Sequence, residues 1–358
     1  MADLMKGKYT YAQLAQKYKN FMVPALKIKR QGKDLITSLK LAVENASITL
    51  SLSNASSCRF TIANAYDPKA RAFDDNIKSQ LMLGTVLQIE IGYSSVTTLV
   101  FKGYVSEITY EFRDAPALDV TVLDVRRLMM AGQNRMMIHS VQNYSQAFTD
   151  VMQRYQKICT TLVIDKTDDK LKCVAQTTSD YKFIAKELAW KADREFFVLA
   201  GKAYFRVPQK ETTEIMSLAW GEGIISFSRS ALYHDAVINV VGFDEEKKEA
   251  VWGEAQSKAE DPQSSVVSEP QPTVYTEPDA AEAEQVKKRA QHEDKKRKRK
   301  TQEGRGICIG LPEIVPGRFI KLEKLDSSLD GIYYIKNVEH NLGSEGFTTG
   351  FSTEGWRR

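Results

Sequence analysis

The chain has 358 residues, enough for two or three domains of ordinary size with buried cores. Apolar residues make up 42% and charged residues 27%, which excludes a disordered or collagen-like chain. No run of about 18 apolar residues occurs, so we expect no membrane span. Met1 to Lys8 lacks the apolar core of a secretion signal, so we expect synthesis and folding in the cytoplasm without a signal peptide.

The net charge of +4 arises in one short stretch of six consecutive cations. These are Lys295, Lys296, Arg297, Lys298, Arg299 and Lys300. Subtracting six from +4 leaves −2 for the rest of the chain, which argues against a broad nucleic-acid surface. We take the six as candidate partner-binding residues. Three interpretations stay open: a solvated loop, a contact with an acidic neighbouring protein, and a contact with nucleic acid, which Glu293 and Asp294 beside the run weaken.

The first part of the chain predicts a helical arm followed by a β domain. Apolar residues at helical spacing predict a helix over 9–20 within an arm at 1–24, and Pro24 ends it. Alternating apolar and polar residues then predict strands, with a short helical insertion at 69–82. The strands are expected at 46–52, 58–63, 85–93, 98–112 and 118–124. We expect a first antiparallel β-barrel domain over 25–128.

The middle of the chain predicts a small α+β domain over 129–210. Its two helices are expected at 145–156 and 180–194, and Ser179 or Asp180 caps the second. A hairpin turns around Gly201-Lys202, between strands at 196–199 and 203–207.

The last part, 211–358, predicts a second β-barrel domain with a charged insertion at about 245–306. The insertion has few aliphatic residues, so we expect it not to order fully, with part of 279–300 as an exposed helix. We also expect 255–303 to be dispensable for folding. Strands are expected at 224–228, 236–243, 318–323, 332–342 and 347–353.

Two segments repeat. Gly84 to Glu90 matches Gly317 to Glu323, since each glycine opens an alternating strand that ends in Glu. Further on, 101–108 parallels 329–338 when Gly103 is aligned with Gly331. Duplication therefore predicts a mostly β, α+β fold in which two similar antiparallel β-barrels flank a small α+β domain. Three such chains present six similar barrels, which match a sixfold partner.

No motif of catalysis or metal binding occurs, and we expect no cofactor and no metal. The cysteines and histidines are scattered without CxxC or HExxH spacing: Cys58, Cys159, Cys173, Cys308, His139, His234, His292 and His340. His340 lies in a predicted strand and is expected to be packed and hydrogen-bonded. Six carboxylates raise glycoside cleavage as an alternative, but we expect them to flank turns and solvent-facing helix positions. They are Asp165, Asp168, Asp169, Glu187, Asp193 and Glu195.

The order of motifs resembles the late control D family of phage tail proteins and the similar hub part of type VI secretion spike proteins. The middle carries Asp180 to Ala189, Phe196-Phe197 and Tyr204-Phe205. The end carries Gly310 to Gly317, Leu329 to Ile335, Val338-Glu339-His340 and Gly346 to Phe351. The resemblance covers about 25–355 and depends on the order of all these motifs.

The resemblance implies a structural, non-enzymatic baseplate hub of a contractile tail or injection particle, from a phage or a phage-tail-like bacteriocin. Such a hub is a homotrimer that joins the sixfold inner tube to the threefold spike within the virion or extracellular tail particle. The implied partners are a separate spike protein, the inner tube or tube-initiator protein, other baseplate proteins, and a tape-measure protein or DNA in the channel. A wall-degrading tail enzyme and a type VI secretion hub remain alternatives.

Overall fold

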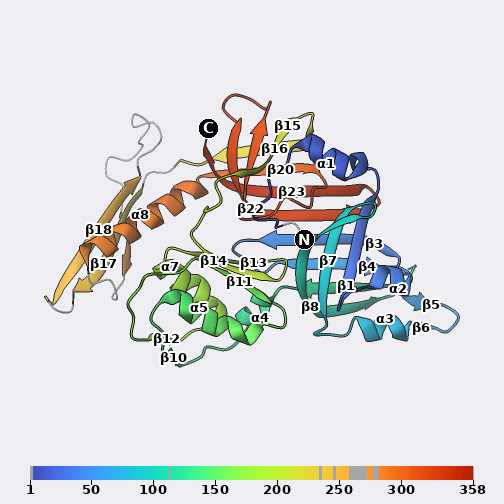
Figure 1. The fold of residues 1–358 in the computed structure, drawn as a ribbon, viewed down its shortest axis with the longest axis horizontal. Coiled ribbons are helices and arrows are strands. Elements are labelled where there is room, and N and C mark those ends of the chain that lie inside the picture. Colours follow the sequence, from blue (N-terminus) through green and yellow to red (C-terminus); the bar gives the residue numbers. More distant parts are fainter. Residues whose placement is uncertain are drawn as a thin grey trace. The chain divides into compact units, whose positions relative to one another are not determined.

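The computed structural model describes residues 3–112, 114–233, 236–244, 247–257, 272–276 and 282–357 (Figure 1). The chain divides into two compact units. Unit 1 comprises Met1–Phe227 and Gly306–Ser352, and unit 2 comprises Ser228–Arg305 and Thr353–Arg358. Within the described ranges, no helix is both long enough and apolar enough to cross a membrane.

The N-terminal helix α1 runs from Tyr11 to Lys17 and is shorter than the sequence predicts. It begins in a capping box, because the Thr10 hydroxyl accepts from the Gln13 backbone N–H while the Gln13 side chain accepts from the Thr10 N–H. It ends early because the next turn, Lys19–Phe21, holds three consecutive residues at positive φ. That backbone conformation is incompatible with a continuing right-handed helix.

The first β region is a run of antiparallel strands in the order β2-β1-β7-β8-β9-β4-β3 (Figure 1). The predicted strands are found there, and β1 and the short helix α2, Leu35–Leu39, are additions that the sequence did not indicate. Mixed patterning explains β1, since only Ile28 of its seven residues is buried. The strands are β1 Pro24–Arg30, β2 Lys33–Asp34, β3 Val43–Ser51, β4 Ser57–Ile62, β7 Val86–Tyr93, β8 Val96–Glu111 and β9 Ala117–Leu123.

The insertion expected as a helix at 69–82 is half hairpin and half helix. Strands β5, Tyr66–Asp67, and β6, Ala72–Phe73, pair before helix α3, Asp75–Gln80, begins. The Asp74 carboxylate fixes the start of α3, because it accepts from the backbone N–H of Asn76 at 2.7 Å.

The middle region packs short helices against a three-stranded sheet of β11, β14 and β13. Phe148, Phe183 and Phe205 are fully buried in its core. The helix expected at 180–194 is one helical run, formed by α6, a π-helical turn and α7, and the Ser179 hydroxyl caps it as predicted. The hairpin turns at Ala200-Gly201, one residue earlier than expected, and both residues have positive φ.

The bounds of this middle region follow. The helices are α4 Val125–Ala131, α5 Tyr144–Met152, the short turn Gln153–Tyr155, α6 Asp180–Lys182, the π-helical turn Phe183–Leu188 and α7 Ala189–Lys191. The strands are β10 Met137–His139, β11 Thr161–Ile164, β12 Val174–Gln176, β13 Glu195–Leu199 and β14 Lys202–Arg206.

The second β region closes into a barrel of six strands. They follow the order β22-β21-β15-β16-β20-β23, and a further pairing of β22 with β23 closes the ring. The pairing of β3 with β22 joins this barrel to the first region, so both belong to one 13-stranded sheet. The strands are β15 Glu214–Trp220, β16 Gly223–Ala231, β20 Gln302–Ile309, β21 Phe319–Glu323, β22 Gly331–Gly343 and β23 Gly346–Arg357.

Strand pairing among the described residues closes only this one barrel, so two closed barrels remain a prediction. The repeat itself has a structural counterpart. Val86 of β7 lies opposite Tyr104 of β8, and Phe319 of β21 lies opposite Tyr334 of β22. This register corrects the sequence alignment, because it makes Gly103 equivalent to Tyr333 and not to Gly331. The two-residue difference keeps every side chain on the same face of the sheet.

Unit 2 contains a three-stranded sheet in the order β18-β17-β19 with helix α8 packed on it. The elements are β17 Ala236–Asp244, β18 Glu249–Ser257, β19 Pro272–Thr276 and α8 Ala283–Lys300. The helix expected within 279–300 is therefore found as α8, and the other described parts of 245–306 are more ordered than the sequence indicated. The low aliphatic content led to an underestimate of this order, because a small buried core is enough to hold the helix on the sheet. That core consists of Ile238, Val240, Val286 and Ala290.

Candidate partner-binding surface

Helix α8 places the six candidate cations on a defined frame. Its inner face carries Val286, Ala290 and Glu293, all buried, at the spacing of successive turns. The helix backbone lies directly on β18 at Gly253, where an added Cβ would stand 2.5 Å from the Val286 carbonyl carbon. Glycine at this point of the strand therefore allows the close approach of helix and sheet.

Two of the six cations are held by neighbours within unit 2. Arg297 continues the inner face and donates to the Thr273 hydroxyl at 3.1 Å and to the Tyr275 hydroxyl at 3.0 Å. Its guanidinium also lies 5.8 Å from the centre of the Tyr275 ring. The Lys296 ammonium pairs with the buried Glu293 carboxylate at 3.0 Å. Arg297 therefore connects the helix to strand β19, and Lys296 forms an ion pair within the helix.

The other four lie at the helix end with different exposure. Lys295, Lys298 and Lys300 are exposed, and no ion pair to another described residue is found for them. Arg299 is half-buried, with its stem next to Gly355. Cations in the last turn also interact favourably with the helix dipole. The run is therefore helical and not the solvated loop that was one of its interpretations, and its binding role remains a prediction.

The six candidate carboxylates include several with structural partners. Asp165 accepts from the Val207 backbone N–H at 2.9 Å and pairs with Lys210. Its partial burial alone raises its pKa, but these hydrogen bonds outweigh burial and hold the pKa below its ordinary value. Glu187 accepts from the Thr178 hydroxyl at 2.7 Å. Asp165 and Glu187 therefore have structural partners, and the non-enzymatic role stays a prediction.

Glu195 belongs to a buried network. It pairs with Arg206 at 2.7 Å and accepts from the Tyr334 hydroxyl at 2.9 Å, and Arg206 in turn donates to the Gly317 carbonyl. Burial, followed by the negative charge of Glu195, raises the pKa of Tyr334 well above its ordinary value. The phenol therefore stays protonated and serves as a donor, which ties the middle region to the second β region.

His340 and most of the cysteines behave as packed core residues. His340 is fully buried, and its Nδ1 lies 2.9 Å from the Thr349 hydroxyl, as the sequence predicted. Burial lowers its pKa to about 3, so the ring is neutral at physiological pH. Cys58, Cys159 and Cys308 are buried, and Cys173 is exposed. Among the described residues, no group of three or more His, Cys, Asp or Glu is placed to hold a metal ion.

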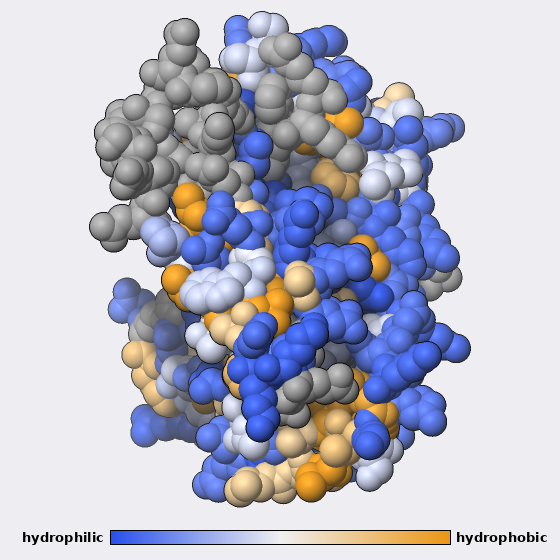
Figure 2. All heavy atoms as spheres, turned by 90° about the vertical axis from the view of Figure 1, so that its left-hand side faces the viewer, coloured by the Kyte–Doolittle hydropathy of each residue, from blue (hydrophilic) through white to orange (hydrophobic). Residues whose placement is uncertain are grey.

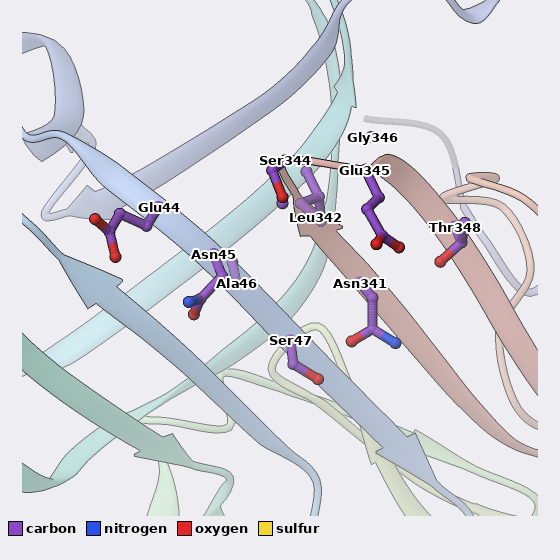
Figure 3. A pocket seen from close by; sticks show the side chains of 11 residues that line it. Glu44, Asn45, Ala46, Ser47, Asn341, Leu342, Ser344, Glu345, Gly346 and Thr348 are labelled. Carbon is purple, nitrogen blue, oxygen red and sulfur yellow. The ribbon is translucent and has the colours of Figure 1, made fainter.

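A hollow of about 900 Å³ lies where β3 and β22 pair (Figure 3). Asn45 and Ser47 line it from β3, and Asn341 from β22, with Glu345 in the turn before β23. Sequence reasoning missed it because its two walls are almost 300 residues apart along the chain. It is open to solvent, unlike the enclosed pockets that hold small ligands.

The surface shown in Figure 2 is mostly hydrophilic, with apolar side chains in separate patches. Exposed apolar residues elsewhere in the described ranges include Met136 at 91% and Ile138 at 70% exposure, on or next to β10. Trp220 and Trp252 are also more than half exposed, so they are not core residues of this chain. They remain candidates for interface residues.

The fold is shared with solved tail proteins. A tail protein from Neisseria meningitidis MC58 superposes with a TM-score of 0.71 at 10% identity, over 93% of this chain and 97% of that one. The 43 kDa tail protein of prophage MuSo2 from Shewanella oneidensis gives 0.70 at 13%, over 92% and 98%. An E. coli component of the type VI secretion system gives 0.57 at 11%, over 93% and 77%.

Sequence comparison assigns the chain to a family. The family model described as the Alg8 N-terminal domain matches residues 21–344, which is most of the chain, and the chain belongs to that family. That description names a domain and no activity. None of the curated proteins matches the sequence.

Proposed function

We propose that this protein is a structural component of a contractile tail or related injection particle, and that it acts as the baseplate hub between tube and spike. The observation that carries the proposal is the fused pair of β regions. Both contain the same strand pairing, and β3 and β22 join them edge to edge in one sheet. Two similar β regions in each chain allow a ring of a few chains to match a tube of higher symmetry.

The symmetry argument concerns the number of copies. Three chains would present six similar β regions, so a threefold ring would match a sixfold tube on one side and a threefold spike on the other. The structures with the same fold support this proposal, since they include phage tail proteins and a component of a secretion system described as similar to T4 tail proteins gp27 and gp5. The proposed partners are therefore tube, spike and other baseplate proteins.

The proposal is a non-enzymatic role. The contacts of Asp165, Glu187 and Glu195 offer no support for the wall-degrading alternative, because each carboxylate is engaged by a structural partner. The solved structures with this fold include a prophage tail protein and a component of a type VI secretion system, so the kind of particle remains open within the proposal.

Deletion of the gene tests the proposal. A hub joins tube to spike, so its loss should remove every particle that carries both parts when preparations are viewed by electron microscopy. A wall-degrading enzyme would leave complete particles that fail to penetrate the cell. Complementation with the Glu195→Gln and Asp165→Asn variants distinguishes the hub role from the wall-degrading role. If the protein is a hub, any variant that folds should restore both complete particles and their penetration of the cell. Complete particles in the deletion strain would overturn the hub assignment.

A further inference from the structure

The outward face of α8 carries only charged and polar side chains. Residues 286, 290 and 293 face the sheet, so the helical period places 288 and 295 on the opposite side and 298 on the adjoining flank. Lys288, Lys295 and Lys298 are all exposed, and we call them the outer lysine stripe. The whole helix holds nine Lys or Arg and three Asp or Glu, which gives it a net charge of +6 (9 − 3).

Two of the three acids within α8 do little to neutralise this stripe, and the third, Asp294, is half-buried beside Lys295. Glu293, which in the sequence weakens a phosphate site, is 5% exposed, lies on the inner face and pairs with Lys296. Glu284 pairs with Lys288 at the start of the helix. Both side chains are about three-quarters exposed, so this ion pair is weak. Lys295 and Lys298 keep their full charge toward solvent.

The composition of this face distinguishes between classes of partner. Protein interfaces have an apolar core and are depleted in lysine, and the outer stripe has no apolar side chain to supply such a core. Membrane-surface helices insert an apolar face, but Val286 and Ala290 of α8 are buried against the sheet, which leaves only Ala283 exposed among its apolar residues. A row of lysines suits the phosphate lattice of nucleic acid, because each ammonium is a point charge that needs no fixed geometry.

We propose that the outer lysine stripe of α8 binds the phosphate backbone of nucleic acid without reading its sequence. The stripe spans ten residues, about 15 Å along the helix axis. Phosphates follow one another every ~3.4 Å along a DNA strand, so the stripe covers about four of them. Three lysines then neutralise about three phosphates. This inference does not depend on the hub assignment, because it follows from the side chains of unit 2 alone.

The test uses the full chain and a fluorescently labelled 20-base-pair duplex of mixed sequence, with anisotropy measured between 50 and 200 mM NaCl. Release of counterions predicts that log affinity falls with log salt at a slope of about −3, since each neutralised phosphate contributes about −0.9. The triple variant Lys288→Gln, Lys295→Gln, Lys298→Gln should bind at least ~10-fold more weakly at 100 mM salt, with a much shallower slope. Replacement of the same three by Arg should preserve binding.

The matched control removes three exposed lysines of unit 1: Lys33→Gln, Lys69→Gln and Lys170→Gln. The net charge is the same in both triple variants, so the control should lose less than about twofold in affinity if the stripe is the site. Thermal unfolding of both variants should match the natural chain, because exposed lysines contribute little to stability. Equal losses in the two variants, or no loss in the stripe variant, would overturn the proposal.

Two other polyanions distinguish the class of ligand. Poly-L-glutamate has a lower charge density than duplex DNA, so it should bind at least ~10-fold more weakly at the same salt. Vesicles of phosphatidylglycerol should bind the natural chain no more tightly than they bind the stripe variant. If poly-L-glutamate binds as tightly as DNA and the stripe variant loses that binding, the ligand is an acidic protein and not nucleic acid. If the natural chain binds the vesicles and the stripe variant does not, the ligand is an anionic lipid surface and not nucleic acid.

Discussion

Gly84 and Gly317 occupy equivalent positions in the two β regions. Both have left-handed backbones, with φ of +82° and +84°, and each N–H donates to a carbonyl of the next strand, Val105 at 2.8 Å and Ile335 at 2.9 Å. The return bonds also correspond, from Val105 to Thr85 and from Ile335 to Arg318. The sequence repeat therefore records one strand-opening geometry that is used twice in the chain.

Alanine at these two positions should destabilise the fold by different amounts. A left-handed backbone costs an L-residue about 1–2 kcal/mol, and the space at Gly84 is open, so Gly84→Ala should cost about that much. At Gly317 an added Cβ would stand 2.8 Å from Nη2 of Arg206, which also donates to the Gly317 carbonyl. Gly317→Ala should therefore cost more in urea unfolding, whereas Gly132→Ala, at an ordinary φ of −66°, serves as the control. A smaller loss at Gly317 than at Gly84 would contradict this.

Arg126 is expected to be the most sensitive cation of the first unit. It is fully buried and donates to the Asp124 carboxylate at 2.7 Å, to the Leu52 carbonyl at 3.1 Å and to the Ser56 hydroxyl at 2.9 Å. Arg126→Met leaves the Asp124 charge buried without its partner, which typically costs about 3–5 kcal/mol. Equilibrium unfolding in urea measures the loss.

An exposed ion pair provides the contrast for this prediction. Lys78 and Asp75 pair on the surface of α3, one turn apart, so Lys78→Met should leave the urea midpoint nearly unchanged. The double variant Asp124→Asn, Arg126→Met should lose less than the sum of its single changes, because the partners act as a unit. A loss at Arg126 as small as at Lys78 would show that the buried network is not required.

Acid should destabilise the native state through His340. Its pKa is about 3 in the folded chain against an ordinary 6.5, so the unfolded chain binds a proton that the folded chain excludes. Stability is complete above pH ~6.5 and falls by about 1.4 kcal/mol per pH unit as pH drops toward the folded pKa. In unfolding measurements from pH 7.5 to 5, His340→Asn should show a shallower loss than the natural chain. Equal pH slopes would exclude His340 as the source.

Removal of the small sheet and helix of unit 2 should leave unit 1 folded. The Leu232 N–H donates to the Thr301 carbonyl at 2.8 Å, so the chain enters and leaves this segment at neighbouring points. A four-residue Gly-Ser linker in place of 234–299 should therefore preserve a cooperative thermal transition, since a short closed loop has a small entropic cost. These limits replace 255–303, which cuts into β18 and β20. Loss of the cooperative transition would contradict the prediction.

Much of the fold was predictable because the strands of the first β region alternate clearly. Ile48 and Leu50, for example, are both fully buried, as their period of two indicates. The hairpin of β13 and β14 shows the limit, since it was expected to turn around Gly201-Lys202 and turns one residue earlier, at Ala200-Gly201. Local patterns specify which elements form, but their ends depend on tertiary contacts.

The candidate site was less predictable than the fold. A run of like charges predicts exposure, and the sequence gives no sign that Arg297 is held by Thr273 and Tyr275 of β19. The order of unit 2 depends on Ile238 and Val240 meeting Val286 and Ala290, a contact between segments almost fifty residues apart. The sequence predicted a barrel in the last part of the chain, but not that β22 and β23 close it, because pairing order is a property of the assembled sheet.

The central claim is that three copies of this chain link a sixfold tube to a threefold spike. Cryo-electron microscopy of the intact particle tests it most directly, with local symmetry determined at the junction of tube and spike. We predict three copies of the chain in a ring, with the repeated pairs β7–β8 and β21–β22 at six similar positions. Six copies or one copy at the junction, or density for the chain elsewhere in the particle, would contradict the hub assignment.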